Sequence, residues 1–147
     1  MTPAGLAQLK IDEGCELTAY PDPLSGGDPW TIGYGSTGLG IEEGVTWTQP
    51  QADNALAAKL AANADELTTA IPWWAQLRDT PRGDVIENMT YNLGVRGLLG
   101  FPKTLACGRA GDYAGFATNM LESAWANQVG ARAQRLSNLM ATGAYPA

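Results

Sequence analysis

An alanine-rich run over residues 48–70 limits the fold of this chain more than any other segment. Thr48 and Pro50 are residue types that cap and open a helix, and alanine is the strongest helix former. A helix of about 20 residues is roughly 30 Å long, which is enough to join two lobes. Its apolar stripe follows no sustained heptad and consists of Leu56, Leu60 and Leu67. A bridging helix is therefore favoured over an interface with a partner helix, which such a stripe can also form.

A glycine-rich segment, residues 13–35, precedes this helix and contains the candidate catalytic groups. Glu13 is the last residue of a predicted helix over residues 3–13, because Gly14 is of the type that ends helices. The negative end of the helix dipole opposes ionisation of a carboxylate there, which suits a general acid. Asp22 follows in a turn rich in proline and glycine, between two runs with strand character.

Two carboxylates beside one cleft, one protonated and one ionised, are the groups that glycoside hydrolysis requires. Glu13 and Asp22 fit that requirement. They also fit an ordinary interpretation, in which Glu13 is a surface charge at a helix end and Asp22 only forms a turn. Their spacing alone does not decide between the two interpretations.

The order of residues around these carboxylates resembles the active-site signature of the phage-type lysozymes, glycoside hydrolase family 24. The signature consists here of Glu13 followed by glycine, then Tyr20-x-Asp22, and then WTIGYG over residues 30–35. The resemblance implies that Glu13 is the general acid and that Asp22 and Thr31 position the attacking water. It also implies inversion at the anomeric carbon.

The loop between Asp22 and Thr31 is longer than expected for the shortest members of that family, and it adds a second acid, Asp28. The distance of Asp22 from Glu13 along the sequence fits the family pattern, whereas Gly-Asp-Pro is typical of loops. Asp22 is therefore preferred, and Asp28 is kept as the alternative.

The resemblance covers nearly the whole chain and is clear again at residues 88–94 and 123–145. In the second stretch it implies that Arg132 reaches Glu13, holds its rotamer and stabilises the carboxylate. The alternative for Arg132 is a surface charge on a helix.

Three residues are expected to contact sugar, and they are Tyr20, Trp30 and Asn92. An aromatic ring such as that of Trp30 stacks on sugars, but it fits equally well in the core of a small lobe. Asn92 fits equally well as a residue satisfied near a helix end before Gly94.

The fold expected from these features is α+β and lysozyme-like, in one domain over residues 1–147. A β-rich lobe is expected at 15–45, a bridging helix at 48–70, and a helical lobe at 72–147 that also includes 1–13. Of the adjacent Trp73 and Trp74, at least one is expected in the core. Further helices are expected at 82–94, through Leu105 and Cys107, at 113–121 after an Asp112 cap, and within 123–143.

The composition of the chain excludes several kinds of catalysis and argues against one class of partner. The chain has no histidine, which excludes Ser-His-Asp and Cys-His catalysis and histidine-ligated zinc. Fifteen acidic and nine basic residues give a net charge of −6, which argues against a nucleic-acid partner. Neither metal nor cofactor is expected. Cys15 and Cys107 are expected to be free thiols, with a single bridge as the alternative.

The resemblance implies bacterial peptidoglycan as substrate, cut at the β-1,4 bond between N-acetylmuramic acid and N-acetylglucosamine by a monomer. The N-terminal stretch lacks the features of a secretion signal, and no apolar run reaches about 18 residues, so synthesis in the host cytoplasm is expected. A phage holin would then be needed to reach the cell wall, unless the protein is attached to a virion.

Two other functions are kept open. A lytic transglycosylase uses one acid and forms an anhydro-sugar, and the presence of both Asp22 and Thr31 counts against it. A non-catalytic wall-binding or virion structural protein would keep the fold and lose the chemistry. The products released from purified walls distinguish all three functions.

Overall fold

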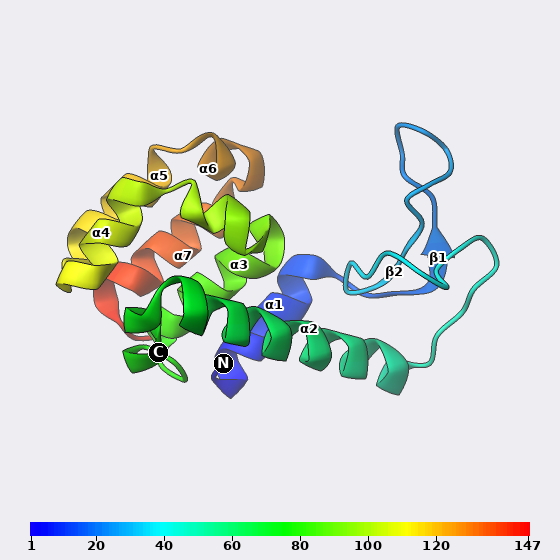
Figure 1. Ribbon diagram of the computed structural model, residues 1–147, viewed down its shortest axis with the longest axis horizontal. Helices are drawn as coiled ribbons and strands as arrows, with labels where there is room; N and C mark the ends of the chain where they lie inside the picture. The colour runs from blue at the N-terminus through cyan, green and yellow to red at the C-terminus, as the bar shows by residue number, and fades with distance from the viewer. The chain divides into compact units, whose positions relative to one another are not determined.

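The computed structural model describes residues 1–147 and groups them into two compact units (Figure 1). Met1–Ala7 together with Asn63–Ala147 are termed unit 1, and Gln8–Ala62 are termed unit 2. Helices dominate, and the single sheet has two antiparallel strands. The α+β fold class that the sequence predicts is therefore confirmed, while the organisation as one domain stays a prediction.

Helices α1, Pro3–Glu13, and α2, Gln49–Ala70, each contribute residues to both units. Both match the predicted ranges to within one residue. A capping box begins α2: Gln51 N donates to Thr48 Oγ1 at 3.3 Å, and Thr48 N donates to Gln51 Oε1 at 2.8 Å. The predicted cap at Thr48 is confirmed, and this helix start is encoded by neighbouring residues alone.

The sheet of unit 2 pairs β1, Glu16–Tyr20, with β2, Thr31–Gly33. The first residue of β1 lies opposite the last residue of β2, and Tyr20 lies opposite Thr31. Because β1 has two more residues than β2 between these pairs, β1 is bulged. The buried apolar side chains of this small unit are Leu9, Ala19, Ile32, Tyr34, Ala52 and Leu56.

Unit 1 is helical. Its elements after α2 are the 3-10 helix η1, Pro72–Gln76, and the helices α3, Pro81–Leu99, α4, Pro102–Ala110, α5, Tyr113–Leu121, α6, Ala124–Val129, and α7, Ala131–Thr142. The largest fully buried side chains of its core are Trp74, Phe116, Leu67, Ile86, Met89, Leu98, Met120 and Met140. Buried Trp74 confirms that at least one of the two adjacent tryptophans packs in the core. None of the helices combines the length and the apolar character that crossing a membrane requires.

Two glycines interrupt the helices of unit 1. Gly94 has a φ of 72° inside α3, and the helical turn after it runs to Leu99, beyond the predicted end of this helix. Gly130 has a φ of 59° and divides the last predicted helical stretch into α6 and α7. Asp112 caps α5 by accepting a hydrogen bond from Gly115 N at 2.9 Å, as predicted. Positive φ values suit glycine because it has no Cβ.

Asp84 in the first turn of α3 is buried and connects sequence-distant parts of unit 1. Its carboxylate accepts hydrogen bonds from Thr2 N at 2.8 Å, from Thr2 Oγ1, and from Tyr145 OH at 2.6 Å. A Cβ on Gly5 would overlap the same carboxylate, so the close approach requires glycine. Asp84 lies in the first turn, at the positive end of the helix dipole, and its burial is a tertiary feature.

Candidate active site

Glu13 is the last residue of α1, and its carboxyl group faces the turn after β2. The helix closes where Gly14 N donates to Lys10 O at 3.0 Å, and Gly14 has a φ of 66°. A Cβ on Gly35 would lie 3.9 Å from Glu13 Oε2, so the carboxylate lies against glycine backbone. Glu13 is partly exposed. A ligand can therefore approach a carboxyl group that lies between a helix end and a glycine turn.

The turn beside Glu13 depends on glycine. Ile32 and Ser36 exchange backbone hydrogen bonds of 2.9 and 2.8 Å across it. Gly33 has a φ of 64°, and a Cβ there would lie 2.9 Å from the indole of Trp47. Gly35 has a φ of 93°. The WTIGYG sequence thus folds into a tight turn that larger residues would disrupt.

Thr31 and Tyr20 are cross-strand partners, so the sheet brings two of the predicted site residues together. Directly opposite side chains on antiparallel strands have Cβ atoms about 4.5–5.5 Å apart. Tyr20 is 41% exposed, and Thr31 is partly buried. Trp30 precedes Thr31 and is also partly buried. These three side chains are therefore on or next to the sheet, and each keeps some surface for a ligand.

Asp22 stabilises the loop that follows β1. Its Oδ2 accepts hydrogen bonds from Leu24 N at 3.2 Å and from Ser25 N at 3.0 Å. Its backbone N donates to Gly27 O at 2.9 Å. The ordinary interpretation, in which Asp22 forms a turn, is thus observed. It uses one carboxylate oxygen and leaves Oδ1 without a hydrogen bond from the chain.

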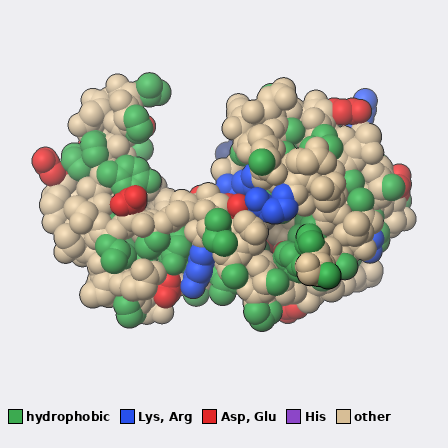
Figure 2. Space-filling model, turned by 180° about the vertical axis from the view of Figure 1, so that it is seen from behind, with side chains coloured by type: hydrophobic (Ala, Val, Ile, Leu, Met, Phe, Trp, Pro, Cys, Tyr) green, Lys and Arg blue, Asp and Glu red, His purple; other side chains and the backbone are tan.

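The loop over residues 22–29 projects from the sheet (Figure 1), and hydrophobic side chains lie on its surface in the space-filling view (Figure 2). Leu24 is 98% exposed. Asp28 is exposed at the other end of the loop, where its backbone O accepts a hydrogen bond from Ser25 Oγ at 2.8 Å. The side chain of Asp28 makes no hydrogen bond to the chain, so its only structural contribution is through the backbone.

A polar network that no sequence pattern predicts lies next to Glu13 in unit 2. Tyr34 OH donates to Asp53 Oδ1 at 3.0 Å. Gln49 Nε2 contacts the same Asp53 oxygen at 2.9 Å and Tyr34 OH at 3.0 Å. Lys10 Nζ lies 3.6 Å from Asp53 Oδ1 and 5.9 Å from the centre of the Tyr34 ring. Residues from α1, the β2 turn and the start of α2 therefore meet at one carboxylate.

Hydrogen bonding in this network changes two pKa values. Donation by Gln49 and then by Tyr34 lowers the pKa of Asp53, and Lys10 adds to this effect. Burial raises the pKa of Tyr34, and its hydrogen bond to Asp53 raises it further. Asp53 is therefore a carboxylate and Tyr34 a neutral phenol near neutral pH, which is the pairing that the donor and acceptor roles require.

Two predicted site residues lie in unit 1 and have partners there. Arg132 Nε donates to Asn88 Oδ1 at 2.9 Å. Asn92 is exposed, and its Oδ1 accepts a hydrogen bond from Trp125 Nε1 at 2.8 Å. Asn92 thus has a hydrogen-bond partner within the chain, as its alternative interpretation expects, and this bond uses the oxygen of its side-chain amide. Contact of Arg132 with Glu13 stays a prediction.

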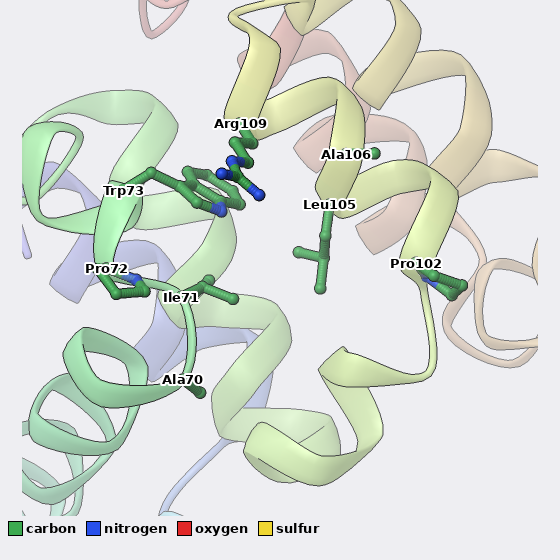
Figure 3. A pocket seen from close by; sticks show the side chains of 8 residues that line it. All are labelled: Ala70, Ile71, Pro72, Trp73, Pro102, Leu105, Ala106 and Arg109. Atoms are coloured by element: carbon green, nitrogen blue, oxygen red, sulfur yellow. The ribbon is translucent and has the colours of Figure 1, made fainter.

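A surface groove of about 530 Å³ lies in unit 1 between η1 and α4 (Figure 3). Trp73 and Arg109 lie side by side at one end of it, opposite Leu105. Its lining is otherwise apolar, and none of the predicted site residues lines it. Without a carboxyl group the groove has no group that could protonate a leaving oxygen. It is therefore not a candidate for the acid chemistry.

Metal and thiol chemistry have no assembled site. No cluster of three or more cysteine and carboxylate side chains is arranged to hold a metal ion. Both cysteines are free thiols. Cys15 Sγ accepts a hydrogen bond from Gln49 Nε2 at 3.9 Å, and Cys107 Sγ accepts one from Asn119 Nδ2 at 3.4 Å.

Charge is divided unevenly between the units. Unit 2 has eight acidic and two basic side chains, so the whole net charge of −6 belongs to the unit that contains Glu13. Unit 1 has seven of each sign, including all six arginines. In Figure 2 the blue side chains lie mostly on the larger unit. A polyanionic ligand would gain no general attraction from unit 2, so recognition there must come from local contacts.

The family described as phage lysozyme matches residues 10–141 of this sequence. The chain therefore belongs to the phage lysozyme family. It is also similar to two curated proteins named endolysin, one from Lactococcus phage c2 and one from Lactococcus phage phivML3. Each is 48% identical over 52 residues, which is 35% of this chain and 22% of the relative. The matched part is thus about a fifth of the length of these relatives.

Proposed function

We propose that this chain is an endolysin that hydrolyses the β-1,4 bond between N-acetylmuramic acid and N-acetylglucosamine in bacterial peptidoglycan. Two findings support this function. The phage lysozyme family matches residues 10–141, and the two similar Lactococcus phage proteins are named endolysins. The observation on which the proposal depends most is the carboxyl group of Glu13, held by the end of α1 against the glycine turn after β2.

Glu13 is proposed as the general acid. It donates its proton to the glycosidic oxygen while the bond from that oxygen to the anomeric carbon breaks. Its partial exposure allows a sugar to approach, and the backbone of Gly35 limits the positions of the carboxyl group on one side. A placed acid of this kind contributes about 10²- to 10⁴-fold to the rate.

Asp22 and Thr31 are proposed to position the water that attacks the anomeric carbon, with Asp28 as the alternative to Asp22. The free Oδ1 of Asp22 is the atom that would accept the proton of this water. Attack by water on the face opposite the leaving group gives an inverted product. The water supplies the new hydroxyl group, so the products are two sugar chains and one of them has a new reducing end.

The remaining site residues are proposed to bind substrate or to orient the acid. Tyr20 and Trp30 are proposed to contact sugar rings, and the surface that both keep exposed at or next to Thr31 supports this. Asn92 is proposed to contact sugar through its amide nitrogen, since its oxygen is bonded to Trp125. Arg132 is proposed to stabilise the carboxylate of Glu13 after proton transfer.

The setting of the reaction is part of the same proposal. The protein acts as a monomer on the cell wall after synthesis in the host cytoplasm, and a holin gives it access to the wall. No metal ion or cofactor takes part, because proton transfer between carboxyl groups and water is sufficient for this hydrolysis.

The test is the release of muropeptides from purified peptidoglycan by the wild type, by Glu13→Gln and by the control Glu16→Gln. Glu16 is an exposed acid of β1 three residues further along, so its loss removes the same charge without removing the acid. We expect new reducing ends from the wild type and the control, and a drop of about 10²- to 10⁴-fold for Glu13→Gln. Anhydro products would instead identify a lytic transglycosylase. No cleavage by a folded wild type that binds walls would identify a binding protein.

A further inference from the structure

We propose that Asp53 is a positioning residue for Glu13, acting through Lys10, Gln49 and Tyr34. The inference rests on the proposed function, since it concerns the residue assigned there as the acid. Asp53 does not touch the reacting atoms in this assignment. Its role is to fix the helix end and the turn between which the carboxyl group of Glu13 lies.

The contacts of this network surround Glu13 along the chain. Lys10 lies three residues before Glu13 in α1 and approaches Asp53 to 3.6 Å. Cys15 lies two residues after Glu13, and its Sγ accepts from Gln49 Nε2 at 3.9 Å. The segment that contains Glu13 is therefore attached to the first turns of α2 on both sides.

Asp53 also contacts the turn after β2, which Glu13 faces. Tyr34 is 6% exposed, and its hydroxyl group donates to Asp53 at 3.0 Å. The next residue, Gly35, has the backbone against which Glu13 Oε2 lies. A single carboxylate on α2 thus connects the helix end that bears Glu13 to the turn that Glu13 faces.

The exposure of the Lys10–Asp53 ion pair indicates that the pair positions nearby groups and adds little to stability. The side chains of Lys10 and Asp53 are 35% and 40% exposed, and ion pairs in such surroundings contribute little to stability. Catalytic groups, in contrast, must be held within roughly 0.5 Å of their productive position. Loss of the network should therefore affect turnover more than it affects folding.

The requirement for oxygen acceptors can be separated from the requirement for charge. Asp53→Asn keeps an oxygen that can accept from Tyr34 and Gln49 and loses the pairing with Lys10. Asp53→Ala loses all three contacts. Asp65→Ala is the matched control, because Asp65 is an aspartate of the same helix outside the network.

The experiment measures kcat and KM for wall cleavage, the melting temperature, and hydrogen exchange at residues 10–15 and 31–36 in all four proteins. We expect Asp53→Ala to lower kcat about 10- to 100-fold with KM nearly unchanged, as a small misplacement of a catalytic group does. Hydrogen exchange at residues 10–15 and 31–36 should be faster in Asp53→Ala than in the wild type. Asp53→Asn should recover most of kcat, and Asp65→Ala should match the wild type.

Two results would overturn this inference and leave the proposed function intact. Both assume that the wild type cleaves walls and that Glu13→Gln does not. The first is a kcat of Asp53→Ala equal to that of the wild type. The second is a loss of kcat with hydrogen exchange at residues 10–15 and 31–36 unchanged, because Asp53 would then not be the group that fixes these two segments. A wild type without cleavage would instead overturn the proposed function and this inference together.

Discussion

Units 1 and 2 differ in the interactions that stabilise each unit internally. Unit 1 has a continuous apolar core formed by its helices, with tryptophan, phenylalanine and methionine side chains fully buried. Unit 2 has a few buried apolar side chains, and its shape depends on glycine turns and on hydrogen bonds between distant polar groups. The proposed acid lies in the second kind of structure. The apolar core and the proposed chemistry thus lie in regions that should respond differently to substitution.

The charge of the units adds to this comparison. Unit 1 is neutral, whereas unit 2 carries the whole net charge of −6. Repulsion among the acidic groups of unit 2 is reduced where they have partners, as Asp53 has in Lys10, Tyr34 and Gln49. Defined polar contacts in unit 2 therefore offset repulsion between like charges, which the neutral unit 1 does not have as a whole.

Phe116→Ala is expected to have the largest effect on folding and tests the role of the core in unit 1. Phe116 is fully buried in α5, so the substitution removes a large apolar group and leaves a cavity. The free energy of unfolding should fall by about 3–5 kcal/mol in urea titrations followed by circular dichroism. The exposed residue Thr118 in the same helix supplies the control, Thr118→Ala, with little expected change. A loss below about 1 kcal/mol would contradict the assigned role of this core.

Gly33→Ala should have an intermediate effect and tests the dependence of unit 2 on glycine. Gly33 has a φ of 64°, and the added Cβ would lie 2.9 Å from Trp47. Gly26→Ala is the matched control, because Gly26 has a φ of 71° and open space around it. We expect Gly33→Ala to lose about 1–3 kcal/mol more than Gly26→Ala in thermal unfolding, which is the usual cost of overpacking. Equal losses would show that the backbone strain, and not the contact with Trp47, sets the cost.

The smallest expected effect concerns pH and the buried acid Glu87 of α3, which is 3% exposed. Burial raises the pKa of Glu87, so the folded chain binds this proton more tightly than the unfolded chain. The contribution to stability is then present at low pH and is lost as the pH rises through the raised pKa. The stability of the wild type relative to Glu87→Gln should therefore increase on acidification. A difference of one pH unit between the folded and unfolded pKa corresponds to about 1.4 kcal/mol.

Urea titrations of both proteins between pH 7 and pH 4 measure this difference. A difference that is independent of pH would mean that Glu87 ionises equally easily in the folded and unfolded chains. Asp53 in unit 2 should affect stability with the opposite pH dependence, because hydrogen bonds lower its pKa. Its contribution is present above the ordinary pKa of an aspartate and is lost as the pH falls through the lowered value.

Residues close together in the sequence allowed much of the fold to be predicted. The capping box of Thr48 and Gln51 and the cap of Asp112 each involve residues three positions apart, so the sequence shows both partners at once. The signature from Glu13 to Gly35 likewise lies in one segment. Its role in catalysis stays a prediction, although the sheet and the turn place its members in one unit.

Other features required the tertiary structure. No sequence pattern indicates that Asp53 bonds to Tyr34, which is 19 residues away, or that Asp84 accepts from Tyr145, which is 61 residues away. The additional helical turn after Gly94 was missed because glycine both ends helices and permits sharp bends within them.

The sequence by itself determined most of the helices, the caps at Thr48 and Asp112 and the family, because each depends on the backbone preferences of a short segment or on residues in a fixed order. Only the tertiary structure decided which polar side chains face one another. It placed the carboxyl group of Glu13 against Gly35 and connected both neighbouring segments to Asp53. Such contacts depend on the packing of α1, the β2 turn and α2, and polar side chains of this kind have no periodic pattern that would reveal their partners.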